Sequence, residues 1–90
     1  MNPNENDELE EALQRGAAAR ALLESDAFNQ VVEELQRVYF AEWLQATDAG
    51  ERERLHARAT ALRDIVDELM GRHSRAEYIT LNQQRERNGS

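Results

Sequence analysis

The sequence predicts an all-α protein built around an antiparallel helical hairpin, and three observations support this. Ala, Leu, Glu, Gln and Arg are abundant and the one proline is Pro3, a composition that favours helix throughout. Two segments, 26–46 and 49–70, carry apolar residues at alternating steps of three and four. The short polar connection between these segments contains signals that start a helix.

An additional N-terminal helix is predicted over residues 8–23. Gly16 interrupts this segment at a cost of ~1 kcal/mol relative to alanine. Acidic residues crowd its first turns, which suits the positive end of a helix dipole. A partial apolar stripe is formed by Leu9, Leu13, Ala17, Leu22 and Leu23. We expect a three-helix arrangement or an oligomeric bundle, preceded by a flexible acidic N-terminus at residues 1–7.

The first helix of the hairpin is predicted over residues 26–46. Ser25 or Asp26 is its N-cap, because a short oxygen-bearing side chain satisfies the free amides of the first turn. The seam then steps by 4, 3, 4 and 3 through Phe28, Val32, Leu35, Tyr39 and Glu42. Four of these five residues are apolar, which is typical of a packed helix.

The second helix of the hairpin is predicted over 49–70. Asp48 and Glu51 have the spacing of a capping box, and Gly71 is a candidate stop. The seam steps by 4, 3, 4 and 3 through Leu55, Ala59, Leu62, Val66 and Leu69. Two helices joined so closely lie antiparallel. Residues 72–79 could add a short helix, so that 8–81 form a single helical domain and 82–90 a flexible C-terminal tail.

The segment 38–44 carries more large apolar side chains than one neighbouring helix can cover. At about 100° per residue, Val38, Tyr39, Phe40, Trp43 and Leu44 span roughly two-thirds of the helix circumference, whereas one neighbour covers an arc of about 100°. Three covers remain open: the helix at 8–23, a second copy of the chain, or a different protein. Aromatic side chains with a polar group are also typical of contact surfaces. The predicted protein-interaction residues are Tyr39, Phe40, Trp43 and Leu44.

The composition excludes the usual ways of stabilising a chain of 90 residues. Such a chain buries only ~60–65% of the surface of its unfolded form, so its core is thin. With no cysteine, disulfides, thiolate metal sites and cysteine nucleophiles are excluded, and two histidines do not make a structural zinc site. We therefore expect stability to come from helix packing or oligomerisation, with no metal and no cofactor.

No residue constellation predicts catalysis. Glu53 and His56 share a helix face, but the spacing occurs once among charged neighbours and indicates an exposed ion pair. His73 and Glu77 are also placed to pair, beside arginines that disfavour a cation. No serine lies in a nucleophile turn and no glycine-rich phosphate loop is present. We expect no enzymatic activity and no small-molecule substrate.

The charge distribution argues against a general nucleic-acid binder. A net charge of −7 disfavours nucleic acid, and residues 1–48 hold −8 whereas residues 49–90 hold +1. Acids interrupt the arginines of the second half, which indicates intrahelical ion pairs rather than a nucleic-acid footprint. With no run of ~18 apolar residues and an acidic N-terminus, we expect no membrane span, no secretory signal and a cytoplasmic site of synthesis.

A set of residues over about 20–70 resembles small helical-hairpin proteins encoded among the structural and packaging genes of tailed bacteriophages. The pattern is a short acidic lead, a Leu-Leu pair, a Tyr-x3-Trp stretch, an acidic turn and a Leu-rich return helix. Its residues are Arg20, Ala21, Leu22, Leu23, Phe28, Leu35, Tyr39, Trp43, Thr47, Arg52, Leu55, Ala61, Leu62 and Leu69. The resemblance implies a non-enzymatic role in virion assembly or DNA packaging in a bacterial host, with incorporation in the virion as one outcome. It implies no catalytic residues.

Two further functions stay open. An acidic anti-defence inhibitor would block the basic groove of a nucleic-acid-handling enzyme, and the −8 charge of residues 1–48 would steer it there. A DNA-binding packaging subunit would use the arginine-bearing second half. Solution mass with and without salt separates these from helix-mediated assembly.

Overall fold

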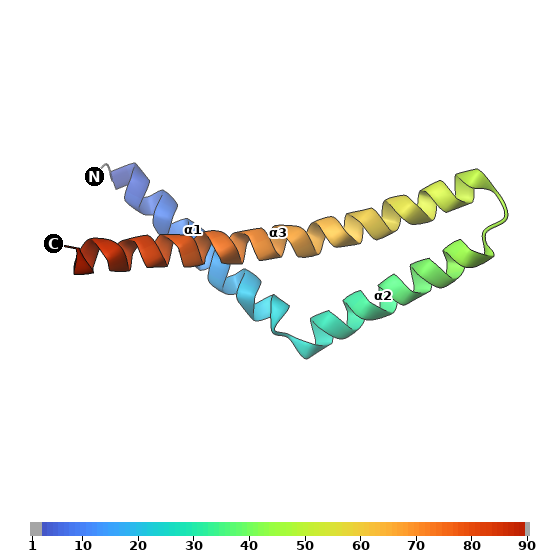
Figure 1. The fold of residues 1–90 in the computed structure, drawn as a ribbon, viewed down its shortest axis with the longest axis horizontal. Helices are drawn as coiled ribbons and strands as arrows, with labels where there is room; N and C mark the ends of the chain where they lie inside the picture. The colour runs from blue at the N-terminus through green and yellow to red at the C-terminus, as the bar shows by residue number, and fades with distance from the viewer. Residues whose placement is uncertain (1–2, 90) are drawn as a thin grey trace.

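The computed structural model describes residues 3–89, which form three helices and no strand. They are α1 (Pro3–Leu23), α2 (Asp26–Gln45) and α3 (Ala49–Asn88). Helix α3 runs the length of the molecule, α1 crosses its C-terminal half, and α2 lies along its N-terminal half (Figure 1). The predicted all-α fold with a third, N-terminal helix is confirmed.

The break between α1 and α2 is stabilised by side chains on both sides. Ser25 is the N-cap of α2, and its hydroxyl accepts a hydrogen bond from the backbone N–H of Phe28 at 3.3 Å. The Asn29 amide donates to the carbonyl oxygen of Leu23 at 2.9 Å, which satisfies one of the free carbonyls at the end of α1. The predicted start of this helix, with Ser25 as one of two candidate caps, is therefore confirmed.

The turn between α2 and α3 is closed in the same way. The Asp48 carboxylate accepts a hydrogen bond from the backbone N–H of Glu51 at 2.8 Å, as the predicted capping box requires of its first residue. Arg52 reaches back and donates from Nε to the carbonyl oxygen of Ala46 at 3.2 Å. Its guanidinium lies 5.4 Å from the centre of the Trp43 ring, a cation–π distance.

Helix α3 does not stop at Gly71, so the predicted end near residue 70 is wrong. It continues to Asn88 over 40 residues and includes the segment 72–79 that the sequence suggested as a separate helix. Gly71 has no positive φ and so does not form a C-cap turn. The reason is tertiary, because α1 packs on the continuation of α3 and stabilises it. Residues 3–7 and 82–88 lie in terminal turns of α1 and α3, and their flexibility stays a prediction.

The contact between α1 and α3 is a close approach of two backbones. A β-carbon added at Gly16 would overlap that of Ala76 and lie 2.8 Å from the carbonyl oxygen of Arg72. Nearby, Ala19 and Ile79 are buried. Gly16 is therefore a packing residue and not an interruption, since only a residue without a β-carbon lets the helices come this close.

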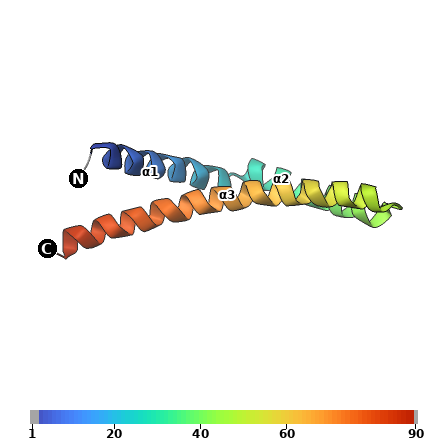
Figure 2. The same cartoon turned by 90° about the horizontal axis from the view of Figure 1, so that it is seen from above.

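The molecule is thin and elongated. Its extents are 64 × 26 × 20 Å, and Figure 2 shows the long, narrow outline with α1 and α3 diverging toward the two ends of the chain. The radius of gyration is 18.9 Å, against about 12 Å for a compact domain of this length. Among residues 3–89 the buried apolar side chains are Ala19, Ala46, Leu55 and Ile79. Two of these are alanines, so the chain on its own buries very little apolar surface.

Candidate protein-interaction surface

The inward stripe of α2 is as the sequence predicts, but it is covered incompletely. Phe28, Val32, Leu35 and Tyr39 are half-buried, and no residue of α2 is fully buried. Glu42, the polar member of the predicted seam, is exposed. Along this half of α3 the buried position is Leu55, close to the α2–α3 turn. Helix α2 therefore has α3 as its neighbour and still leaves apolar surface open.

Three of the four predicted interaction residues lie on this open surface. Phe40 is 62% exposed, Leu44 is 59% exposed and Trp43 is 41% exposed. The fourth, Tyr39, is half-buried and lines a groove together with residues of α3. Helix α1 does not cover them, because it packs on the other half of α3 (Figure 1). Of the three covers that the sequence left open, a second copy and a different protein remain.

A groove of about 440 Å³ runs between α2 and α3 beside this surface. Tyr39, Phe40 and Trp43 line it from α2. Leu55 and Ala59 line it from α3, so most of the groove is apolar. Arg63 of α3 also lines it, and the Arg52 guanidinium lies above the Trp43 ring. The groove is thus an apolar trough with cationic groups at its edge.

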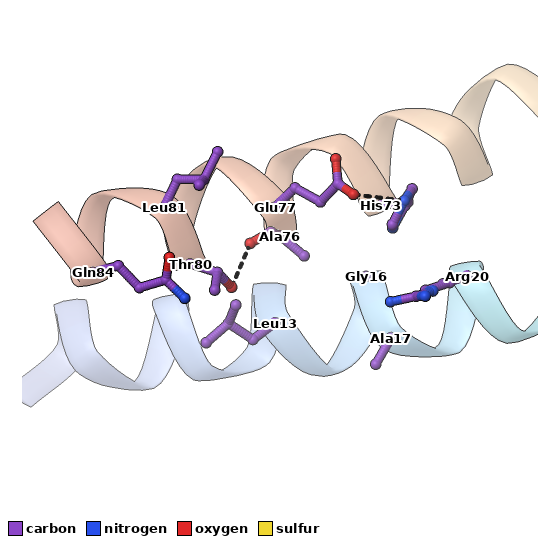
Figure 3. A pocket seen from close by; sticks show the side chains of 10 residues that line it. All are labelled: Leu13, Gly16, Ala17, Arg20, His73, Ala76, Glu77, Thr80, Leu81 and Gln84. Carbon is purple, nitrogen blue, oxygen red and sulfur yellow. Dashed lines mark hydrogen bonds and ion pairs between the residues drawn. The ribbon is translucent and has the colours of Figure 1, made fainter.

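A second hollow of about 500 Å³ lies between α1 and α3 and was not predicted (Figure 3). Its α3 wall carries two local interactions: His73 Nε2 lies 3.2 Å from Glu77 Oε1, and the Thr80 hydroxyl donates to the Ala76 carbonyl oxygen at 2.9 Å. Arg20 lines it from α1, and the hydrogen bond and charge of Glu24 raise the pKa of its guanidinium. This hollow is more polar than the groove beside α2.

Of the candidate chemical groups, His73 and Glu77 pair with each other, and the remaining groups lie apart from them. Glu53 and His56 are both exposed, and Ser25 serves as a helix cap. Within the described part of the chain no three His, Cys, Asp or Glu residues lie together as metal ligands would. Over the same residues, no helix combines the length and the apolar character needed to cross a bilayer.

Two arginines of the second half form local contacts, and one of these contacts is an intrahelical ion pair of the predicted kind. Arg72 pairs with Glu68 at 3.2 Å within α3. Arg52 caps the end of α2. In α1, two arginines pair with acids four residues away: Arg15 with Glu11, and Arg20 with Glu24. Such exposed pairs contribute little to stability, because solvent screens both charges.

The close contact at Gly16 and Ala76 was missed by the sequence reasoning. A signal was present: Ala12, Gly16, Ala19 and Leu23 step by 4, 3 and 4. On α3 the predicted seam also continues beyond Leu69 in steps of four and three, through His73 and Ala76. Because Gly16 lies within a helical repeat of small residues, it can be identified as a contact position.

Comparison with known proteins adds no relative. No protein family, no curated protein and no solved structure matches the chain. The resemblance to tailed-phage hairpin proteins therefore stays an expectation carried by the residues quoted for it.

Proposed function

We propose that this protein is a non-enzymatic accessory protein that binds other proteins through helix–helix contacts, in the assembly or packaging of a phage-type particle. The observation that carries the proposal is the exposure of Phe40, Trp43 and Leu44 on α2, next to an apolar groove. The assembly setting comes from the resemblance over residues 20–70.

The energetics favour a covered surface. Full burial of one large apolar side chain contributes ~1.5–3 kcal/mol, a substantial amount for a small chain with a thin core. Contiguous exposed apolar patches on small proteins mark interaction sites. Covering Phe40 and Leu44, both more than half exposed, would therefore stabilise the complex and the fold together.

The shape of the surface favours a helical partner. The groove is bounded by two antiparallel helices, and α2 offers a length of about 30 Å at 1.5 Å per residue. An amphipathic helix laid into such a trough buries its apolar face at positions spaced by three and four residues. Arg63 and Arg52 at the edge would favour acidic residues on the flank of that helix.

Photo-cross-linking in the producing cells tests this proposal. A benzoylphenylalanine in place of Phe40 is expected to form a discrete covalent adduct with another protein chain. The matched control is the same group at Glu34, which is exposed on α2 about 120° round the helix from Phe40. The paired substitution Phe40→Gln with Leu44→Gln should abolish the adduct from the cross-linker placed at Trp43 while helical content is retained.

The proposal fails on either of two results. One is equal adduct formation from positions 40 and 34. The other is full biological function of a folded Phe40→Gln, Leu44→Gln double variant. A loss of function from His56→Ala in a folded protein that keeps its partners would instead indicate chemistry at that histidine.

The acidic-inhibitor function remains a second candidate, favoured by the exposure of the acids on α1. Asp7, Glu8, Glu10 and Glu11 are all exposed, so their charge is available to a basic surface. Binding of this kind weakens steeply with salt, whereas apolar helix packing does not. Affinity measured at low and at ~0.5 M salt therefore separates the two functions.

A further inference from the structure

One flank of α3 connects the two hollows of the molecule. His56, Arg63, Met70, Glu77 and Gln84 are spaced by seven residues and so lie along one side of the helix. His56 and Arg63 line the groove against α2, whereas Glu77 and Gln84 line the hollow against α1. Met70 lies midway between them and is 52% exposed. Both hollows therefore open on the same flank, with Met70 at its centre.

We propose that this flank binds a second copy of the chain, with the two α3 helices antiparallel and Met70 at the twofold axis. The groove between α2 and α3 of one copy then faces the hollow between α1 and α3 of the other. This inference deepens the proposed function, and rests on it, by naming one partner of the exposed α2 surface.

Charge complementarity selects the antiparallel direction. Arg63 and Glu77 are equidistant from Met70, so an antiparallel pair brings Arg63 of each copy opposite Glu77 of the other. Arg63 has no ion-pair partner in its own chain among the described residues, and Glu77 is paired with His73. A parallel pair would instead place Arg63 against Arg63 and Glu77 against Glu77. Like charges in those positions repel.

The exposed apolar residues of α3 favour the same flank. At about 100° per residue, Leu81 lies about 20° from Met70 and Tyr78 about 80° from it, on the same side. They are 56% and 65% exposed. In the antiparallel arrangement Leu81 falls opposite Ala59, at the groove that Phe40 and Trp43 line on the other copy. The bulky residues that α2 leaves open thus meet the bulky residues that α3 leaves open.

The accessible surface of the chain is larger than that of a compact monomer of the same mass. The accessible surface is 7310 Å² for a 10.4 kDa chain. A compact monomer of this mass has about 5,400 Å². The excess is about 1,900 Å² per chain, or about 3,800 Å² for two, which lies within the range of obligate homodimer interfaces.

The antiparallel pairing also supplies the helices that each half of α3 lacks within its own chain. Each half of α3 has one helix of its own chain beside it, α2 on the first half and α1 on the second (Figure 1). Antiparallel pairing places α3 and α2 of one copy against α3 and α1 of the other at both ends. Every section then contains four helices, enough to enclose an apolar core.

Single-cysteine variants test the interface, because the chain has no cysteine of its own. Met70→Cys should give a covalent dimer on a denaturing gel after mild oxidation, since residues at a twofold axis come within disulfide reach. Ile65→Cys is the matched control: Ile65 is 54% exposed and lies about 140° round α3 from Met70. On the same gel it should run as a single chain, because its cysteines face away from the interface.

A second pair of cysteine variants tests whether the two α3 helices are antiparallel. Arg63→Cys and Glu77→Cys should each resist cross-linking alone and form a covalent dimer when mixed. A parallel pair would give the reverse result and overturn the proposed arrangement. Arg63→Glu should convert the light-scattering mass from dimer to monomer, and Arg63→Glu combined with Glu77→Arg should restore the dimer.

The inference is overturned if the wild-type chain scatters as a monomer throughout, or if Met70→Cys cross-links no faster than Ile65→Cys. Circular dichroism of each variant shows that it is still helical. If the chain is a monomer but position 40 forms an adduct with a different protein, the inferred binding of a second copy is overturned and the proposed function stays intact. A dimer in which position 40 cross-links to the second copy but to no different protein supports the inference and overturns the binding of a different protein.

Discussion

The two halves of α3 hold their neighbours in opposite ways. On the C-terminal half, Gly16 of α1 lies against Ala76, and small side chains let the backbones approach until Ala19 and Ile79 are buried. On the N-terminal half, α2 presents bulky residues such as Tyr39 and Trp43, and none of its residues is fully buried. Small residues allow a close and extensive contact between α1 and α3 within the chain. Large residues hold the helices apart and leave apolar surface for a partner.

The largest effect is expected from removing a buried side chain where α1 crosses α3. Ile79→Ala should lower the free energy of unfolding by about 2–4 kcal/mol, because Ile79 is 8% exposed and its loss leaves a cavity. Ile65→Ala removes the same atoms from a side chain that is 54% exposed and should cost much less. Urea denaturation at matched protein concentration measures both. Equal losses would show that the crossing is no better packed than the open flank.

Gly16→Ala tests the close approach itself. Alanine favours helix over glycine by ~1 kcal/mol, yet the added methyl would overlap Ala76 and crowd the Arg72 carbonyl. We expect a net destabilisation of about 1–3 kcal/mol, as for other overpacked contacts. Thermal unfolding followed at 222 nm checks the sign. A stabilised variant would contradict the packing role given to Gly16.

Removing the N-cap of α3, beside the α2–α3 turn, should lower the stability by a smaller amount. Asp48→Ala leaves the N–H of Glu51 without its acceptor and should cost ~1 kcal/mol. Thr47→Ala is the neighbouring control, since its side chain is exposed and does not cap α3. The difference in urea midpoint between the two variants reports the cap. No difference would mean that the start of α3 does not depend on Asp48.

The smallest effect is expected at Gly71 and has the opposite sign to that at Gly16. A β-carbon there would meet nothing within 4 Å, so Gly71→Ala should stabilise α3 by up to ~1 kcal/mol. The same chemical change at two glycines of the chain thus distinguishes a packed position from an open one. Destabilisation by Gly71→Ala would indicate that α3 needs to bend at that residue.

Local signals made the hairpin predictable. The apolar steps from Phe28 to Tyr39 and from Leu55 to Leu69 placed both helices. Ser25 and Asp48 placed the breaks, because a capping side chain acts within three residues of itself. Exposure of Phe40 and Leu44 also followed, since one neighbour cannot cover such a broad apolar arc.

The α1–α3 contact could not be predicted from local sequence signals. Gly16 and Gly71 look alike in the sequence, as isolated glycines in helical surroundings, and both were taken as interruptions or stops. Their roles differ because of what lies opposite each one, which depends on the path of the whole chain. The continuation of α3 to Asn88 has the same origin, since α1 stabilises residues whose own pattern is weaker.

The length of α3 has a practical consequence for attaching anything to this protein. The first turns of α1 and the last turns of α3 lie at one end of the 64 Å molecule, whereas the α2–α3 turn lies at the other (Figure 1). A tag, dye or fused domain at either terminus will therefore project from the same end, far from Trp43. Fluorophores on the C-termini of two copies would sit at opposite tips of an antiparallel pair.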